Sequence, residues 1–114
     1  MGPSNRRYAN AAIIIETELT PPDLLDHLKA IETSFGRRLG TGIRWGARVL
    51  DLDIILWSGG LWVSPGLAIP HPAFRERGFV LTPAVDIAPG WRDPVTGLRL
   101  RHLKARLDRK GPHP

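Results

Sequence analysis

The sequence predicts an α+β fold, because strand-like and helix-like patterns both occur along it. Residues 11–19 and 50–57 are rich in β-branched and apolar side chains, which favours strands. Between them, apolar residues recur at helical spacing and predict one buried stripe, formed by Leu24, Leu25, Leu28, Ile31 and Phe35. With 114 residues, 42% of them hydrophobic and 24% charged, the chain is expected to form one small domain over residues 1–114.

The helix that follows the first predicted strand has clear signals at both ends. Thr20 can cap it, Pro21 suits its first turn, and Asp23 suits its positively polarised end. Gly36 is the expected C-cap after Phe35.

The remaining elements alternate with breaks rich in Gly and Pro, of which the chain has 12 and 11. Residues 37–49 predict a loop, 50–57 a strand, 58–60 a turn and 61–63 a short returning strand. Residues 64–72 predict irregular chain, 74–88 one or two short helices and 93–97 a turn. Residues 99–114 predict a basic terminal segment, with a helix over 100–107 and a frayed end from 111.

Composition excludes several classes of protein and suggests phosphate-bearing partners. The absence of cysteine excludes a disulfide scaffold, a cysteine-ligated zinc site and a thiol nucleophile. No apolar run approaches the ~20 residues needed to span a bilayer, and no apolar signal core follows Met1, so a cytoplasmic protein without membrane partners is expected. The net charge is +5, and 13 of the 16 cations are arginines, whose planar donors match phosphate oxygens. The excess of positive charge lies in residues 37–48 and in the tail. A solvated basic surface is the favoured interpretation for the tail but not for residues 37–48.

The sharpest chemical feature is the pair Asp51 and Asp53. Leu50, Leu52 and Ile54 alternate with them, so on a strand both carboxylates leave one face, with backbones about 6.5–7 Å apart. That spacing suits two divalent cations and phosphoryl transfer. An isolated pair of this kind is more often an ordinary polar strand face, but here it follows an arginine-rich glycine loop.

Other candidates lie before and after this pair. Arginines of the loop could close over phosphates, while Trp45 fits either a cap on a planar ligand or a core anchor. His71 lies between two prolines, and Arg77 and Phe79 follow it closely. The remaining polar candidates are Tyr8 and Asn10, which share a strand face suited to a heterocycle, and Glu16 and Glu32, which are interpreted as surface acids.

Several motifs, read in order, resemble 6-hydroxymethyl-7,8-dihydropterin pyrophosphokinase of folate biosynthesis. They are Tyr-x-Asn-Ala-Ala from Tyr8, Arg-Trp-Gly-Ala-Arg-Val-Leu-Asp-Leu-Asp-Ile from Arg44, Pro-His-Pro from Pro70 and Arg-Glu-Arg-Gly-Phe from Arg75. The resemblance implies a ferredoxin-like α+β fold and transfer of pyrophosphate from ATP to the hydroxymethyl group of a reduced pterin, with two magnesium ions and release of AMP.

The resemblance also implies a role for each matching residue. Asp51 and Asp53 would bind magnesium. Tyr8, Asn10, Trp45 and Phe79 would bind the pterin. The ATP site would comprise Glu32, Arg37, Arg44, Arg48, Ile54, His71 and Arg77, with Arg37, Arg48, His71 and Arg77 acting in catalysis.

The chain also departs from the family pattern. The Gly-Ser-Asn strand with which the family begins is not found, so the first βαβ portion is expected to be absent. Gly66 and Ala68 replace an Arg and a Thr found in some members. The absent portion would leave an open sheet edge and bare apolar surface around Ile13 and Ile15, which a homodimer could cover. Two alternatives stay open: a catalytically impaired remnant acting through self-association or a partner, and, more weakly, a small basic nucleic-acid-binding domain.

Overall fold

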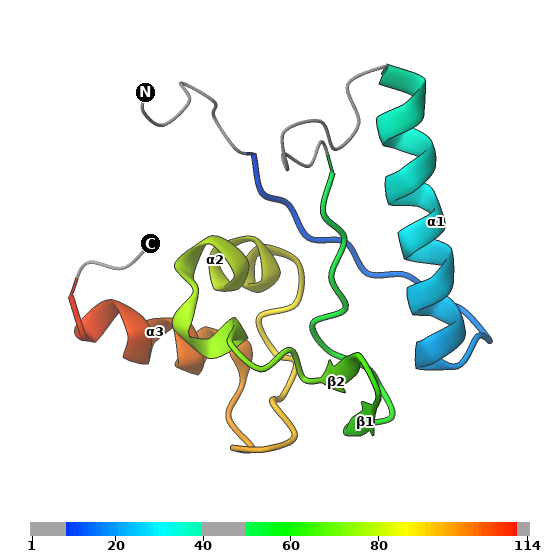
Figure 1. The fold of residues 1–114 in the computed structure, drawn as a ribbon. Coiled ribbons are helices and arrows are strands. Elements are labelled where there is room, and N and C mark those ends of the chain that lie inside the picture. Colours follow the sequence, from blue (N-terminus) through cyan, green and yellow to red (C-terminus); the bar gives the residue numbers. More distant parts are fainter. Residues whose placement is uncertain (1–8, 40–49, 112–114) are drawn as a thin grey trace. The chain divides into compact units, whose positions relative to one another are not determined.

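The computed structural model describes residues 9–39 and 50–111, in which the chain divides into two compact units. One unit joins Met1–Ile15 to Ala73–Pro114, and the other is Glu16–Pro72. The elements in chain order are a long helix, a two-stranded antiparallel hairpin, a 3-10 turn and two shorter helices (Figure 1). This confirms the α+β class, whereas the ferredoxin-like arrangement and the single domain over 1–114 stay predictions.

Helix α1 spans Pro21–Leu39 in the Glu16–Pro72 unit and begins as predicted. Thr20 Oγ1 accepts a hydrogen bond from the Asp23 N–H at 3.4 Å, which makes Thr20 the cap. The predicted end at Gly36 is wrong, because Gly36 lacks the positive φ of a C-cap glycine and the helix continues through it. The predicted apolar stripe is half-buried except at Ile31, which is 50% exposed.

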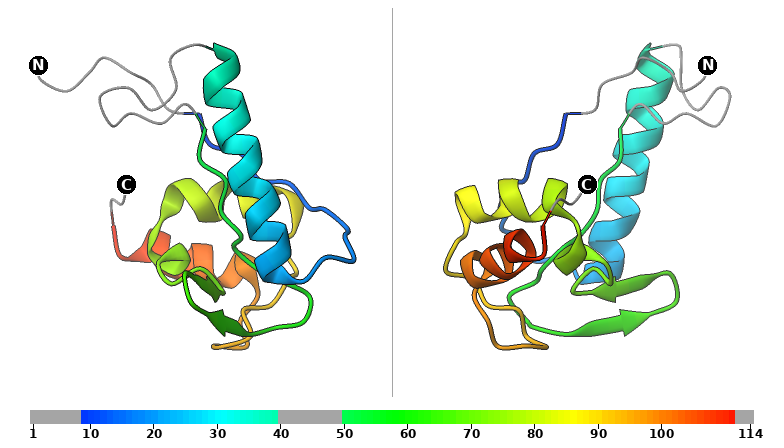
Figure 2. Two further views of the ribbon diagram at one scale, coloured as in Figure 1. Left: turned by 45° about the vertical axis from the view of Figure 1, so that its right-hand side comes forward. Right: turned by 90° about the vertical axis from the view of Figure 1, so that its left-hand side faces the viewer.

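The strands predicted over residues 11–19 and 50–57 are not formed. Both segments are irregular chain, and within the described ranges neither is paired in a ladder. A strand exists only through hydrogen bonds to a neighbouring strand, so β-branched composition alone does not make one. Residues 50–57 instead run alongside α1 in their unit (Figures 1 and 2).

The hairpin comprises β1 (Trp62–Ser64) and β2 (Leu67–Ile69), which pair with Val63 opposite Ala68. The prediction of irregular chain over 64–72 is therefore wrong in part, and the strand predicted at 61–63 lies one residue later. Pro65 and Gly66 form the connection, and Gly66 has φ +77°. That angle fits the third position of a type II turn, which follows Pro and requires a left-handed residue.

The turn predicted at residues 58–60 is present, since the Gly60 N–H donates to the Trp57 carbonyl at 3.0 Å. Gly60 also takes a positive φ, of 94°. The segments on either side of this turn are not strand partners, because the sheet in the described residues contains β1 and β2 alone and residues 50–57 form no strand.

The second unit contains a 3-10 turn η2 (Phe74–Glu76) and the helices α2 (Gly78–Ile87) and α3 (Leu100–Arg109). These elements confirm the short helices predicted over 74–88 and the terminal helix, which runs two residues further than predicted. They pack on one another (Figure 2) around a buried core of Phe74, Leu81, Leu100, Leu103 and Leu107. None of the helices in the described ranges has the length and apolar character needed to cross a membrane.

A buried ion pair joins η2 to the turn over residues 93–97, and the sequence interpretation missed it. Arg75 donates to both carboxylate oxygens of Asp93, one at 2.7 Å, and Asp93 is fully buried. Val95 N–H and the Thr96 hydroxyl donate to the same carboxylate at 3.0 and 2.8 Å. Burial alone would raise the pKa of Asp93, but the hydrogen bonds from Arg75, Val95 and Thr96 outweigh it and lower the pKa to about 2.

Candidate functional site

The carboxylate pair lies in the Glu16–Pro72 unit with the alternation that the sequence predicts. Asp51 and Asp53 are exposed, whereas Leu50, Leu52 and Ile54 are half-buried. The two acids are therefore presented to solvent, although no ladder among residues 9–39 and 50–111 holds the segment. Another interaction must fix this piece of backbone if the pair is to keep a constant geometry.

Glu32 supplies such an interaction from α1. Its Oε2 accepts a hydrogen bond from the backbone N–H of Leu52 at 2.6 Å, and its Oε1 lies 4.0 Å from Lys29 Nζ. Its side chain is only 13% exposed, so the interpretation of Glu32 as a surface acid is wrong. The signal was present in the sequence, because Glu32 is four residues from Leu28 and three from Phe35, on the apolar side of the helix.

His71 is hydrogen-bonded to the same segment at Ile55, which lies three residues after Leu52. The backbone N–H of His71 donates to the Ile55 carbonyl at 3.0 Å, and the residue is half-buried. The structure thus brings Glu32 and His71 to the segment that carries Asp51, Asp53 and Ile54. Arg37 lies in the last turns of α1 and is exposed.

The donor set near Asp51 and Asp53 is a sparse one. Among the described residues, no group of three or more His, Cys, Asp or Glu side chains could hold a metal ion on its own. Two exposed carboxylates nevertheless fit magnesium, which usually keeps several waters and is bound through one or two carboxylates together with substrate phosphates. A softer metal, which needs a dedicated set of nitrogen or sulfur ligands, does not fit them.

The other described candidates, Asn10, Arg77 and Phe79, belong to the second unit. The Arg77 guanidinium carbon lies 5.8 Å from the centre of the Phe79 ring, within cation–π range. Phe79 is 40% exposed and Arg77 is half-buried, so an aromatic ring and a cation are presented together at the start of α2. Asn10 is exposed in the irregular N-terminal segment.

Four candidates lie outside the described residues: Tyr8, Arg44, Trp45 and Arg48. The roles that the resemblance implies for them therefore stay predictions.

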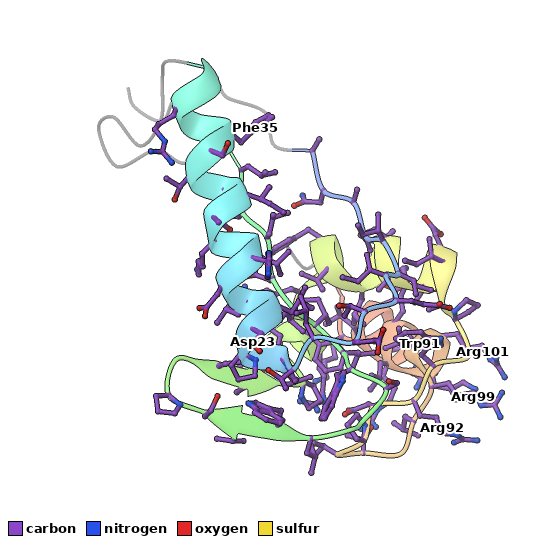
Figure 3. All side chains as sticks on the ribbon, turned by 90° about the vertical axis from the view of Figure 1, so that its right-hand side faces the viewer. Asp23, Phe35, Trp91, Arg92, Arg99 and Arg101 are labelled. Carbon is purple, nitrogen blue, oxygen red and sulfur yellow. The ribbon has the colours of Figure 1, made fainter. Side chains whose placement is uncertain are left out.

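A cationic surface around Trp91 was not singled out from the sequence. Arg92 pairs with Arg99 across an isolated antiparallel bridge, and the Leu100 N–H donates to the Trp91 carbonyl at 2.8 Å. Figure 3 shows Arg92, Arg99 and Arg101 with Trp91 along one side of this unit. Because Arg92 and Arg99 are opposite each other in the bridge, their positive charges lie on the same face. Trp91, next to Arg92 in the chain, is 40% exposed.

Comparison with known proteins gives the family. The family model for 7,8-dihydro-6-hydroxymethylpterin-pyrophosphokinase matches residues 1–89. Enzymes named 2-amino-4-hydroxy-6-hydroxymethyldihydropteridine pyrophosphokinase are similar to the chain in Synechocystis sp. (42% identity over 94% of this chain) and Pseudomonas aeruginosa (44% over 82%). A folate synthesis bifunctional protein of Arabidopsis thaliana is 47% identical over 71% of this chain and 16% of its own length. The chain spans about half of the two bacterial relatives, 54% and 57% of their lengths. Because the family model covers most of the sequence, the chain belongs to the 7,8-dihydro-6-hydroxymethylpterin-pyrophosphokinase family.

Proposed function

We propose that the chain transfers pyrophosphate from ATP to the hydroxymethyl group of 6-hydroxymethyl-7,8-dihydropterin, as the names of its relatives indicate for them. The oxygen of the pterin hydroxymethyl group would lose its proton to solvent and form a bond to the β-phosphorus, the bond from that phosphorus to the α,β-bridging oxygen would break, and AMP would leave. The observation that carries the proposal is the exposed pair Asp51 and Asp53 on a segment tethered to α1.

The roles of this chain's residues follow from their chemistry. Asp51 and Asp53 would hold two magnesium ions, which neutralise phosphate charge and orient the ATP. Phe79 offers a ring face to the pterin, while Asn10 can both donate to and accept from its polar edge. We expect catalysis to depend mainly on positioning and on charge neutralisation rather than on a strong general base.

Phosphate binding would rest on the cations already named. Arg77 and His71, together with Arg37, would contact the ATP phosphates, and Glu32 and Ile54 would line the nucleotide site. The Arg77 guanidinium beside the Phe79 ring supports a site in which a phosphate and a flat ring are bound close together. Tyr8, Arg44, Trp45 and Arg48 would complete it.

Calorimetry with a non-hydrolysable ATP analogue tests this function, with and without magnesium and a dihydropterin analogue. We expect magnesium-dependent binding by the unaltered chain, and loss of that dependence in Asp51→Ala and in Asp53→Ala. Asp26→Ala removes an exposed carboxylate of α1 and is the matched control, which should behave like the unaltered chain. An unchanged magnesium response in both aspartate variants would refute the metal assignment.

Two other outcomes favour the alternatives. Absence of nucleotide binding at millimolar concentration favours a catalytically impaired member that acts through assembly. Salt-sensitive binding of single-stranded nucleic acid without any magnesium response favours a nucleic-acid-binding domain. Its binding surface would then be the one formed by Trp91, Arg92, Arg99 and Arg101. Three phosphate contacts there would give a slope of about −2 in a plot of log affinity against log salt concentration.

We also infer that the chain self-associates through the segment that contains Ile13. Ile13 is 81% exposed, and Ile14 and Ile15 are 48% and 50% exposed. Three adjacent β-branched residues without a ladder in the described structure offer both apolar surface and backbone groups to a second copy.

A further inference from the structure

The Glu32 side chain is directed at backbone rather than at solvent. It reaches from α1 to the N–H of Leu52, the residue between Asp51 and Asp53, at 2.6 Å. Leu52 is 20 residues away in sequence, so this is a tertiary contact and not a local helical one. The Glu32 side chain is 13% exposed.

A carboxylate in such a position needs a reason, because removing a charge from water is costly unless hydrogen bonds replace the hydration. A leucine at the same place on the apolar side of α1 would bury its side chain without that cost. The benefit of Glu32 therefore lies in the bonds that it makes. The bond to Leu52 is of the strong kind, in which an ionised acceptor meets a backbone N–H.

This bond fixes the geometry of the acidic pair. The N–H of Leu52 belongs to the peptide unit that joins Asp51 to Leu52, so holding it fixes the plane of the peptide directly after Asp51 and directly before the residue that precedes Asp53. The segment is tied again at Ile55, whose carbonyl accepts from the His71 N–H at 3.0 Å. Asp53 therefore lies between two tethers in a stretch that no described ladder supports.

We propose that Glu32 is a positioning residue for divalent-cation binding, which it serves by holding the Asp51–Leu52 peptide, and so the segment that carries Asp51 and Asp53, through the Leu52 N–H. This inference rests on the proposed function of Asp51 and Asp53 as cation ligands. It gives Glu32 a role in this chain apart from lining the nucleotide site. Groups that orient metal ligands typically change metal affinity by about 10- to 100-fold when they are removed.

The test uses the full chain, with Mn²⁺ as the probe, and two readouts. The first is the exchange rate of the Leu52 amide with deuterium, measured by NMR, which reports the hydrogen bond without any metal. The second is Mn²⁺ affinity, measured by electron paramagnetic resonance. Glu32→Ala should speed the exchange of the Leu52 amide about tenfold or more, as loss of a hydrogen bond to a charged acceptor predicts, and weaken Mn²⁺ binding by about 10- to 100-fold.

Glu32→Gln separates positioning from charge, because its amide oxygen can still accept from Leu52 while the negative charge is gone. We expect it to keep most of the Leu52 protection and to bind Mn²⁺ within a few-fold of the unaltered chain. Asp26→Ala is the control for loss of a carboxylate from α1 and should change neither readout.

The outcomes are distinguishable. Unaltered Leu52 exchange and Mn²⁺ affinity in Glu32→Ala would overturn the positioning role alone. The positioning role would also be overturned if Glu32→Gln kept the Leu52 amide protected but bound Mn²⁺ as weakly as Glu32→Ala does. In that case the negative charge of Glu32, and not its hydrogen bond, would support Mn²⁺ binding. Mn²⁺ binding that ignores Asp51→Asn and Asp53→Asn would overturn the metal site and, with it, the positioning role, whatever the Leu52 exchange shows.

Discussion

Asp93→Asn should destabilise the chain far more than the loss of any exposed acid. The substitution keeps the shape of the side chain but turns one acceptor into a donor that faces the Arg75 guanidinium. Arg75, whose side chain is 27% exposed, would lose its bidentate partner, and the contacts from Val95 and Thr96 would weaken. Breaking a buried pair of this kind costs about 3 kcal/mol.

The assay is thermal unfolding followed by circular dichroism, at pH 7 and at lower pH. For a chain of this size, a loss of about 3 kcal/mol corresponds to a fall of roughly 12 °C in the melting temperature. Asp108→Asn is the matched control, because Asp108 pairs with Lys104 at 2.8 Å on the surface of α3 and should cost at most about 0.5 kcal/mol.

The stabilisation that Asp93 contributes should depend on pH. Because the folded-state pKa of Asp93 is about 2, below its ordinary value of 3.8, the stabilisation is complete above about pH 5 and is lost as the pH falls toward 2. The difference in pKa corresponds to about 2 kcal/mol. The difference in the free energy of unfolding between the unaltered chain and Asp93→Asn should therefore become smaller at acidic pH. Equal stability losses for Asp93→Asn and Asp108→Asn, or a gap that stays constant down to pH 2, would refute this reasoning.

Two further predictions concern the hairpin and the N-terminal segment. Gly66→Ala should cost about 1 kcal/mol in thermal unfolding, because Gly66 has φ +77°, whereas Gly90→Ala, at a glycine with open space and no positive φ, should cost less; equal costs would contradict the turn assignment. Ile13→Asp should shift the mass in light scattering at micromolar concentration toward the monomer, and a monomeric mass for the unaltered chain would contradict self-association.

Local signals in the sequence predicted the helical part of the fold. Thr20 and the pattern after it fixed the start of α1, and the short helices near Phe74 and Leu100 followed from breaks at proline and glycine. A helix closes its hydrogen bonds within its own segment, so these signals suffice. The end of α1 was missed because a glycine can also continue a helix at a cost of about 1 kcal/mol.

Strands depend on partners that local sequence does not name. Residues 11–19 and 50–57 have strand composition but no ladder in the described structure, whereas β1 and β2 pair through a turn whose Pro-Gly signal at Pro65 and Gly66 was available. At the candidate site, too, local features could be predicted from the sequence and long-range contacts could not. Alternation predicted the exposure of Asp51 and Asp53, but the bond from Leu52 to Glu32 spans 20 residues and needed the structure.

Pyrophosphoryl transfer itself is the most direct test of the proposed function. The chain is mixed with ATP, magnesium and 6-hydroxymethyl-7,8-dihydropterin, and phosphorus NMR follows the products. We predict that AMP and the pterin pyrophosphate form in equal amounts, only when magnesium is present, and that Asp53→Ala abolishes both while Asp26→Ala does not. Unconsumed ATP, or ADP in place of AMP, would contradict the account.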